Sequence, residues 1–371
     1  MRIAHLGSKG IPSKGGTERV VEAVAVRHAP HHLVTVYGNA AVCESGFHLG
    51  VRVLSYKAPV MKHAGPVLLQ IRCALHALTR DRYDVVHVHG SEHGFIVPLL
   101  RVRYPVVSTN HGPAYLREKW SSVAKRMIRA NERLSVVGAS AATAVAPNQA
   151  LSLGERYGRT VVPVANGVDL DQDVDVDGAA QMLKAQGIEP GSYVLFAAAR
   201  VDPTKGCHTL LEALPSLTER VPVVVVGDLG HARGYEKRLR DLARGLPVSF
   251  LPRLDDKALL LGLLALCRVF VFPSTVEAMS MMLLEALAVG VVSLASDIPE
   301  NVSVVPPTFP LFSAGNPDSL ARGLETLLRA DLDQRRALSS LGREWVRSRH
   351  DWDRIARQYM AIYQEIVKSR E

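Results

Sequence analysis

The sequence has few cysteines and lacks the motifs of several large protein classes. Its four cysteines, Cys43, Cys73, Cys207 and Cys267, are far apart and form no C-x-x-C pair. This excludes a small disulfide-built secreted fold and a structural zinc site, and it fits a reducing cytosol. There is also no zinc-finger, helix-turn-helix or RNA-recognition signature, so we expect no nucleic-acid partner.

No apolar run in the sequence is long enough to cross a membrane. The most apolar stretch, Ala258–Phe272, contains Arg268 and is followed by Pro273, whereas a transmembrane helix needs about 20 predominantly apolar residues. We expect this stretch to form a buried helix followed by a strand. Met1–Leu6 runs directly into Gly7 and is too short for the apolar core of a signal peptide. We therefore expect a cytoplasmic protein, either free in solution or peripheral at the inner face of the membrane.

The chain is long and apolar enough for two domains, and it carries an excess of positive charge. It has 371 residues, of which 47% are hydrophobic and 22% are charged, a typical globular balance. Lys and Arg number 44 against 36 Asp and Glu, which gives a net charge of +8. This excess favours an anionic ligand or an anionic membrane surface.

Short β-branched runs alternate with helical patterns in both halves of the chain, which indicates βαβ units and mostly parallel, doubly wound sheets. The strands expected in the first half are Ile3–Leu6, Leu33–Tyr37, Val51–Leu54, Val85–His89, Val106–Thr109, Thr143–Ala146 and Val161–Val164. Those expected in the second half are Tyr193–Ala198, Val221–Val226, Val248–Leu251, Val269–Phe272 and Val291–Ala295. Between the halves, Asp169–Gly178 is acidic and has no periodicity, so we interpret it as a linker.

We therefore predict an α/β protein with two Rossmann-like domains, over residues 1–170 and 171–350, followed by a C-terminal helix in 351–371. Ligands of such sheets bind at the carboxyl ends of the strands, so the site is expected in a cleft between the domains.

A glycine-rich loop, Gly7–Gly16, follows the first strand and opens a helix. Its backbone N–H groups and the helix dipole suit a phosphate, and a tight turn without a ligand is the alternative. The glycines do not follow the G-x-G-x-x-G or P-loop spacing, and the second strand ends without a carboxylate for an NAD ribose. Both absences argue against an NAD-dependent dehydrogenase.

Two cations and two glutamates follow strands of the second half. Arg200 and Lys205 lie in a turn that leads into a helix, where they suit a diphosphate whose charge grows as a bond to it breaks. Glu277 follows a buried strand and Glu285 lies in the next helix, so both can accept hydrogen bonds from hydroxyl groups. The alternatives are surface cations around a proline turn and a Glu277 that caps the helix.

Histidines occur near the ends of two strands in the first half. His87 and His89 lie on one face of a strand, like a metal-binding pair, but no third ligand at suitable spacing accompanies them. We therefore expect a structural or cleft-lining role without metal. His111 lies at the end of another strand, beside a Gly-Pro turn, and we take it as a candidate site residue.

Together these motifs resemble the retaining glycosyltransferases of family 4, which have the GT-B architecture of two Rossmann-like domains. The resemblance covers nearly the whole chain and rests on Gly15-Gly16, Asn110-His111-Gly112, Asn166–Asp169, Arg200 with Lys205-Gly206, Gly227, Glu277 with Glu285, and the helix from Trp352. In this fold the final helix crosses back to the first domain. The N-terminal Gly10–Glu18 is also similar to bacterial transferases that build rhamnose- or glucose-containing surface polysaccharides.

The resemblance implies transfer of a hexose, with retention, from a nucleotide-diphosphate sugar to a glycan, lipid-linked or small-molecule acceptor. A UDP-sugar is the favoured donor, and no metal or other cofactor is implied. The first domain would bind the acceptor and the second the donor. Arg200 and Lys205 would stabilise the leaving diphosphate, Glu277 would face the transferred sugar and His111 would lie near it.

The donor-binding positions that the resemblance implies are Gly15, Gly16, Gly227, Arg253, Leu254, Ser280, Met281, Met282 and Glu285. Glu285 would hold the ribose hydroxyls. Ala278-Met279-Ser280 stands where family members often have Gly-Phe-Gly, so the sequence does not specify the donor sugar. A nucleotide-sugar epimerase of the same architecture and a non-catalytic nucleotide-binding protein are the alternatives.

The segment Tyr115–Leu134 is basic from Arg117 to Arg133 and amphipathic. On its other side, roughly helical spacing relates Trp120, Val123, Met127 and Leu134. Such a helix can lie on an anionic membrane, which would suit a lipid-linked acceptor. A packed helix with a solvated cationic face is the alternative.

Overall fold

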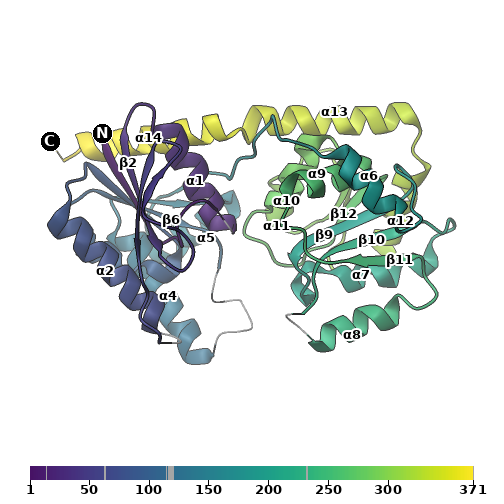
Figure 1. Ribbon diagram of the computed structural model, residues 1–371, viewed down its shortest axis with the longest axis horizontal. Helices are drawn as coiled ribbons and strands as arrows, with labels where there is room; N and C mark the ends of the chain where they lie inside the picture. The colour runs from purple at the N-terminus through teal and green to yellow at the C-terminus, as the bar shows by residue number, and fades with distance from the viewer. Residues whose placement is uncertain (14, 62–63, 114, 116–120, 231–232, 371) are drawn as a thin grey trace. The chain divides into compact units, whose positions relative to one another are not determined.

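The computed structural model describes residues 1–13, 15–61, 64–113, 115, 121–230 and 233–370 (Figure 1). The chain divides into two compact units. Unit 1 combines Met1–Gly167 with Trp352–Glu371, and unit 2 is Val168–Asp351. Each unit is built around its own sheet, so each is described separately.

The sheet of unit 1 has the order β3-β4-β2-β1-β5-β6-β7-β8, and all neighbours are parallel except β3 and β4. Its strands are β1 (Arg2–Leu6), β2 (Leu33–Asn39), β3 (Gly46–His48), β4 (Val51–Tyr56), β5 (Val85–His89), β6 (Val106–Asn110), β7 (Ala141–Ala144) and β8 (Val161–Pro163). Every residue of β5 and β6 is buried, as expected for central parallel strands covered by helices on both faces.

The helices of unit 1 are α1 (Gly16–His28), α2 (Ala64–Arg80), α3 (Ile96–Arg101), α4 (Ser122–Gly138), α5 (Pro147–Tyr157) and α14 (Trp352–Lys368), with a short 3₁₀ turn at Ser91–His93. The last helix, α14, returns to this unit and packs beside α1 (Figure 1). His28 donates from Nε2 to the carbonyl oxygen of Ala356 at 2.9 Å, and Trp352, Tyr359 and Tyr363 of α14 are fully buried. The C-terminal helix is therefore part of the core of unit 1.

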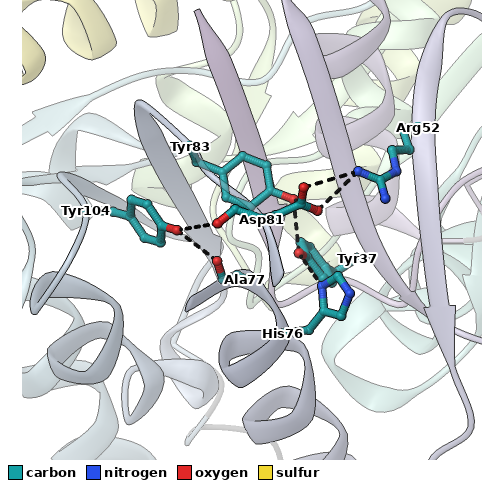
Figure 2. Close-up of polar contacts among 7 residues, drawn as sticks. All are labelled: Tyr37, Arg52, His76, Ala77, Asp81, Tyr83 and Tyr104. Atoms are coloured by element: carbon teal, nitrogen blue, oxygen red, sulfur yellow. Dashed lines mark hydrogen bonds and ion pairs between the residues drawn. The ribbon is translucent and has the colours of Figure 1, made fainter. Parts of the chain in front are cut away.

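A network of hydrogen bonds and an ion pair connects the end of α2 and the turn after it to the sheet (Figure 2). The hydroxyl of Tyr37 on β2 lies 3.1 Å from Nδ1 of His76 and 3.0 Å from the hydroxyl of Tyr83. Tyr83 donates to Asp81 at 3.0 Å, and Arg52 of β4 pairs with the same carboxylate at 3.1 Å. Burial raises the pKa of Tyr37 and of Tyr83, so both stay neutral. The network is structural, because every group in it has a partner within unit 1.

Helix α4 does not bury the apolar positions that the sequence pattern assigns to its packed side. Val123 and Met127 are 65% and 62% exposed, beside the exposed Arg126, and the buried residues include Ile128 and Val136. The N-terminal part of the predicted basic segment, including Arg117 and Trp120, lies outside the described residues.

The sheet of unit 2 is parallel throughout, with the order β11-β10-β9-β12-β13-β14. Its strands are β9 (Val194–Arg200), β10 (Val223–Asp228), β11 (Val248–Leu251), β12 (Val269–Phe272), β13 (Ser293–Ser296) and β14 (Leu311–Phe312). Its helices are α6 (Val176–Lys184), α7 (Cys207–Ala213), α8 (Arg233–Leu242), α9 (Lys257–Leu266), α10 (Met281–Val289), α11 (Pro299–Val302), α12 (Pro317–Arg329) and α13 (Leu332–Arg349). Valines, leucines and phenylalanines of the strands form one core with α7 and α12.

Two expectations about this half can be compared with the structure. The apolar stretch Ala258–Phe272 forms α9 and β12, as predicted, and no helix among the described residues has the length and hydrophobicity to span a bilayer. The linker predicted at Asp169–Gly178 is wrong at its end, because α6 begins at Val176. The Asp175 side chain accepts from the N–H of Gly178 at 2.8 Å and so caps this helix.

Candidate functional site

Two loops of unit 2 meet at the carboxyl edge of its sheet, because β9 and β12 are parallel neighbours. The N–H of Thr275, after β12, donates to the carbonyl oxygen of Thr204, after β9, at 2.8 Å. Gly206 has a φ of +69°, and a Cβ there would lie 1.9 Å from the carbonyl oxygen of Pro273. Glycine therefore allows both the left-handed backbone and the close approach of the two loops.

This approach brings Lys205 and Glu277 together. The ammonium Nζ of Lys205 lies 2.6 Å from Oε1 of Glu277, and the side chains are 27% and 11% exposed. Glu277 does not cap helix α10, since the hydroxyl of Ser280 accepts from the N–H of Leu283 at 3.2 Å. The pair thus offers a partly accessible ammonium group beside a carboxylate. It lies at the carboxyl ends of the strands, where ligands bind in such sheets.

Glu285 has a cationic partner that the sequence interpretation missed. Its side chain is 2% exposed and pairs with Lys257, the first residue of α9. A cation at a helix N-terminus opposes the helix dipole, so it needs a compensating contact. The position of Lys257 at the start of a predicted helix is the sequence signal that could have indicated an acidic partner for it.

The N-terminus of α10 is fixed beside the Lys205–Glu277 pair. Leu283 and Leu284 are fully buried and anchor the first turn in the core. The first N–H groups of a helix have no intrahelical acceptors, and the dipole gives them positive potential. Met281 and Met282, the first two residues of this helix, are partly exposed.

The other candidate residues of unit 2 lie on neighbouring strand ends. Arg200 is the exposed last residue of β9. Gly227, near the end of β10, has a φ of +151°, and a Cβ there would lie 2.0 Å from the carbonyl oxygen of Ala198. Arg253 and Leu254 follow β11, and Nε of Arg253 lies 3.0 Å from Oδ1 of Asp255. All these positions share the carboxyl edge of one parallel sheet.

In unit 1, Gly15 and Gly16 form the start of α1, where Gly15 is the N-cap in an extended conformation. The nearly buried carboxylate of Glu18 accepts from the N–H of Lys9 at 3.2 Å. An acidic side chain therefore takes one N–H donor of the loop that the sequence suggested for phosphate.

His111 is held in a turn directly after β6. Asn110 fixes this turn, because its Oδ1 accepts from the N–H of Gly112 at 2.9 Å and from Gln149 at 2.7 Å. Nε2 of His111 lies 3.1 Å from Nδ1 of His89. Burial lowers the pKa of His111 to about 4, against a smaller opposing effect of Glu92, so its ring is neutral at pH 7.

A third histidine joins His87 and His89, so the expectation that no further ligand accompanies them is wrong. His5 on β1 pairs in register with His87, and possible ligand atoms of His5, His87 and His89 lie within 4.8 Å of one another. Both ring nitrogens of His87 already have partners, the hydroxyls of Tyr363 and Thr109, each at 2.6 Å. A metal ion would have to break these buried hydrogen bonds, so the trio fits a structural role better.

Residues 14–172 match the family model Glycosyltransferase Family 4, and residues 180–345 match the model Glycosyl transferases group 1. A phosphatidyl-myo-inositol mannosyltransferase of Mycobacterium leprae is 30% identical, over 84% of this chain and 82% of its own length. The chain belongs to glycosyltransferase family 4. The corresponding Mycobacterium tuberculosis protein is 28% identical over 100% of this chain and 98% of its own length.

Solved structures confirm the fold class of this glycosyltransferase. Sucrose-phosphate synthase from Thermosynechococcus elongatus superimposes with a TM-score of 0.82 at 20% identity, covering 99% of each chain. Anabaena HepE in complex with UDP and glucose gives a TM-score of 0.80 at 20% identity, covering 98% of this chain and 100% of HepE. The two parallel-sheet units are therefore the two domains of a GT-B fold.

Replacing Gly206 by alanine tests the close approach of the two loops. We expect unit 2 to lose about 3 kcal/mol or more, because the new methyl group adds a clash with Pro273 to the cost of a left-handed alanine. Gly187→Ala is the matched control, since Gly187 has the same φ of +69° and a Cβ there would meet nothing within 4 Å. Urea denaturation that gives equal losses for the two variants would show that the loops do not depend on this contact.

Proposed function

We propose that this glycosyltransferase moves a hexose from a nucleoside-diphosphate sugar to an acceptor hydroxyl, with retention of the anomeric configuration. The observation that carries the proposal is the 2.6 Å contact between Nζ of Lys205 and Oε1 of Glu277. An ammonium group suits a diphosphate oxygen, and a carboxylate suits the hydroxyls of a sugar. The pair thus matches the two halves of such a donor.

The proposed reaction needs positioning and charge stabilisation rather than a strong base. The bond between the anomeric carbon and the phosphate oxygen breaks, and the acceptor oxygen bonds to the same face of that carbon. The acceptor's proton moves to the departing phosphate oxygen. Lys205 and Arg200 stabilise the negative charge that develops there, with the N–H groups at the start of α10. Because these cations carry the neutralising role, the proposal includes no metal ion.

Other residues complete the proposed donor site. Glu285 accepts from the ribose hydroxyls, the backbone near Gly227 and Arg253-Leu254 packs against the base, and Gly15, Gly16 and His111 of unit 1 act on the phosphate and sugar. UDP is the proposed nucleotide, supported by HepE in complex with UDP and glucose. The mycobacterial relatives are named for a phosphatidyl-myo-inositol acceptor, which supports a lipid-linked acceptor over the soluble alternatives.

A thermal-shift screen of nucleoside diphosphates, followed by turnover assays with the matching sugar nucleotides, tests this function. We expect stabilisation by UDP, and transfer to an acceptor in which NMR shows the anomeric configuration of the donor. An inverted linkage would overturn retention. Conversion of the sugar without an acceptor would identify an epimerase, and binding without turnover on a broad acceptor panel would identify a nucleotide-binding protein.

We further propose that helix α4 contacts an anionic membrane, which would bring the enzyme to a lipid-linked acceptor. Support comes from its exposed apolar residues, Val123 and Met127, which lie on the same helix as the exposed cations Arg126 and Arg133. Apolar side chains can enter the headgroup region while the cations attract anionic lipids.

Co-sedimentation with vesicles that contain phosphatidylserine tests the membrane proposal. Each cation near such a surface contributes about 1 kcal/mol, so Arg126→Gln with Arg133→Gln should weaken binding about 30-fold at low salt. Lys184→Gln with Lys237→Gln, in unit 2, is the control with the same change of charge. Failure of the unmodified protein to bind at moderate salt ends the proposal.

A further inference from the structure

Three histidines form a hydrogen-bonded line from the interior of unit 1 to the candidate residue His111. Nδ1 of His5 lies 3.0 Å from Nε2 of His89, and Nδ1 of His89 lies 3.1 Å from Nε2 of His111. The residues come from β1, from the end of β5 and from the turn after β6. The line therefore crosses three adjacent strands and ends on His111.

All three rings are neutral at pH 7, so each carries one N–H. Burial lowers the pKa of His5 to about 3, lowers that of His89 well below its usual value, and lowers that of His111 to about 4. In a neutral imidazole one nitrogen donates and the other accepts. Within a line of such rings, the tautomer of one ring fixes the tautomers of the others.

The inner end of the line determines its direction. Nε2 of His5 is buried and has no hydrogen-bond partner among the described residues. If His5 accepted from His89, its single N–H would be on Nε2, a buried donor without an acceptor. If His5 donates from Nδ1, only a lone pair is left unsatisfied, which proteins tolerate better than an unpaired N–H. His5 therefore donates to His89, and His89 donates to His111.

We propose that His89 is a positioning residue that holds His111 in the tautomer with its proton on Nδ1. Nε2 of His111 accepts from His89, which leaves Nδ1–H as the ring's donor. This rests on the proposed function, in which His111 lies near the transferred sugar. There the ring donates a hydrogen bond to an oxygen of the donor substrate and takes up no proton itself.

The neighbouring His87 does not belong to this line, although its ring centre lies 3.9 Å from that of His89. Its two nitrogens are engaged by Tyr363 and Thr109. His93 is also separate, since its Nδ1 lies 2.9 Å from the backbone oxygen of His89 rather than from the ring. Among the residues that the structure describes, the imidazole of His89 thus has two hydrogen-bond partners, His5 and His111.

Nitrogen-15 NMR of histidine-labelled full-length protein tests the tautomer directly. At pH 7.5 we expect the His111 signals to show a proton on Nδ1 and none on Nε2, with assignment by their loss in His111→Gln. A proton on Nε2, or averaging between the two forms, overturns the inference. Because this readout needs no turnover, it separates failure of the tautomer assignment from failure of the proposed function.

Two variants of His89 then test its positioning role. The amide nitrogen of His89→Asn can replace Nδ1 and keep the donation to His111, whereas His89→Gln reaches the position of Nε2 and keeps contact with His5 alone. For His89→Asn we expect a kcat within about twofold of that of the unmodified enzyme. For His89→Gln we expect a kcat about five- to tenfold lower, with little change in the KM for the donor, because one hydrogen bond to His111 is lost. Equal losses in the two variants, or a change confined to KM, would contradict the role.

Discussion

Replacing Lys205 by alanine is expected to lower kcat by about 10²–10³-fold, the usual effect of removing one preorganised electrostatic partner of a transition state. The proposed role of Lys205 is to stabilise charge on the departing phosphate, and this charge is larger in the transition state than in the bound donor. The loss should therefore appear in kcat as well as in kcat/KM. Initial rates with the donor found in the nucleotide screen measure both.

The chain should remain folded in this variant. The Lys205–Glu277 pair is partly exposed, so it contributes about 0–1 kcal/mol, and the midpoint of unfolding should fall by no more than about 2–4 °C. Lys237→Ala, an exposed lysine of α8 in the same unit, is the matched control and should keep full turnover. Near-normal turnover of Lys205→Ala with its true donor would show that Lys205 does not stabilise the departing phosphate.

The central strands were predictable from the sequence because burial on both faces leaves a continuous apolar run. β5, β10 and β12 lie at or within two residues of their predicted ranges. The missed strands β3 and β14 lie at sheet edges and have three and two residues, too few to show a pattern. Whether such a short edge strand forms depends on its pairing with a neighbouring strand, and the local sequence pattern does not predict this pairing.

The contacts of the candidate site were harder to predict than its residues. The sequence and its family resemblance pointed to both Lys205 and Glu277, but their contact depends on the approach of two loops at Gly206. Lys257 was missed because its partner, Glu285, lies on another helix. His5 was missed because the position of β1 next to β5 is a property of strand order, which spacing along the chain does not contain.

The stability of unit 1 is expected to fall steeply between pH 7 and pH 5 because of its buried histidines. His5, His87 and His89 have no exposed surface, and burial lowers the pKa of His5 to about 3 and those of His87 and His89 well below the usual value. In the unfolded chain each titrates near 6.5, so below that pH the unfolded state binds protons that the folded state does not. Stability is therefore nearly constant above pH 7 and decreases as the pH falls from about 6.5 toward the folded-state values.

Linkage gives the size of this decrease. A histidine that stays neutral in the folded state costs about 2 kcal/mol between pH 7 and pH 5, so the three together cost about 6 kcal/mol. This is comparable to the whole stability of many domains, about 5–15 kcal/mol. Urea denaturation at the two pH values measures it, followed by tryptophan fluorescence in a Trp345→Phe background, in which the remaining tryptophans belong to the segments of unit 1.

His5→Asn is the variant that isolates one titrating group. The asparagine amide can keep the donation to His89 but takes up no proton between pH 7 and pH 5. Whatever its stability at pH 7, the variant should lose about 2 kcal/mol less than the unmodified protein on acidification. An unchanged pH dependence would mean that His5 takes up its proton in the folded state over the same pH range as in the unfolded chain. That result would contradict its neutral form and, with it, the direction of the line from His5 through His89 to His111.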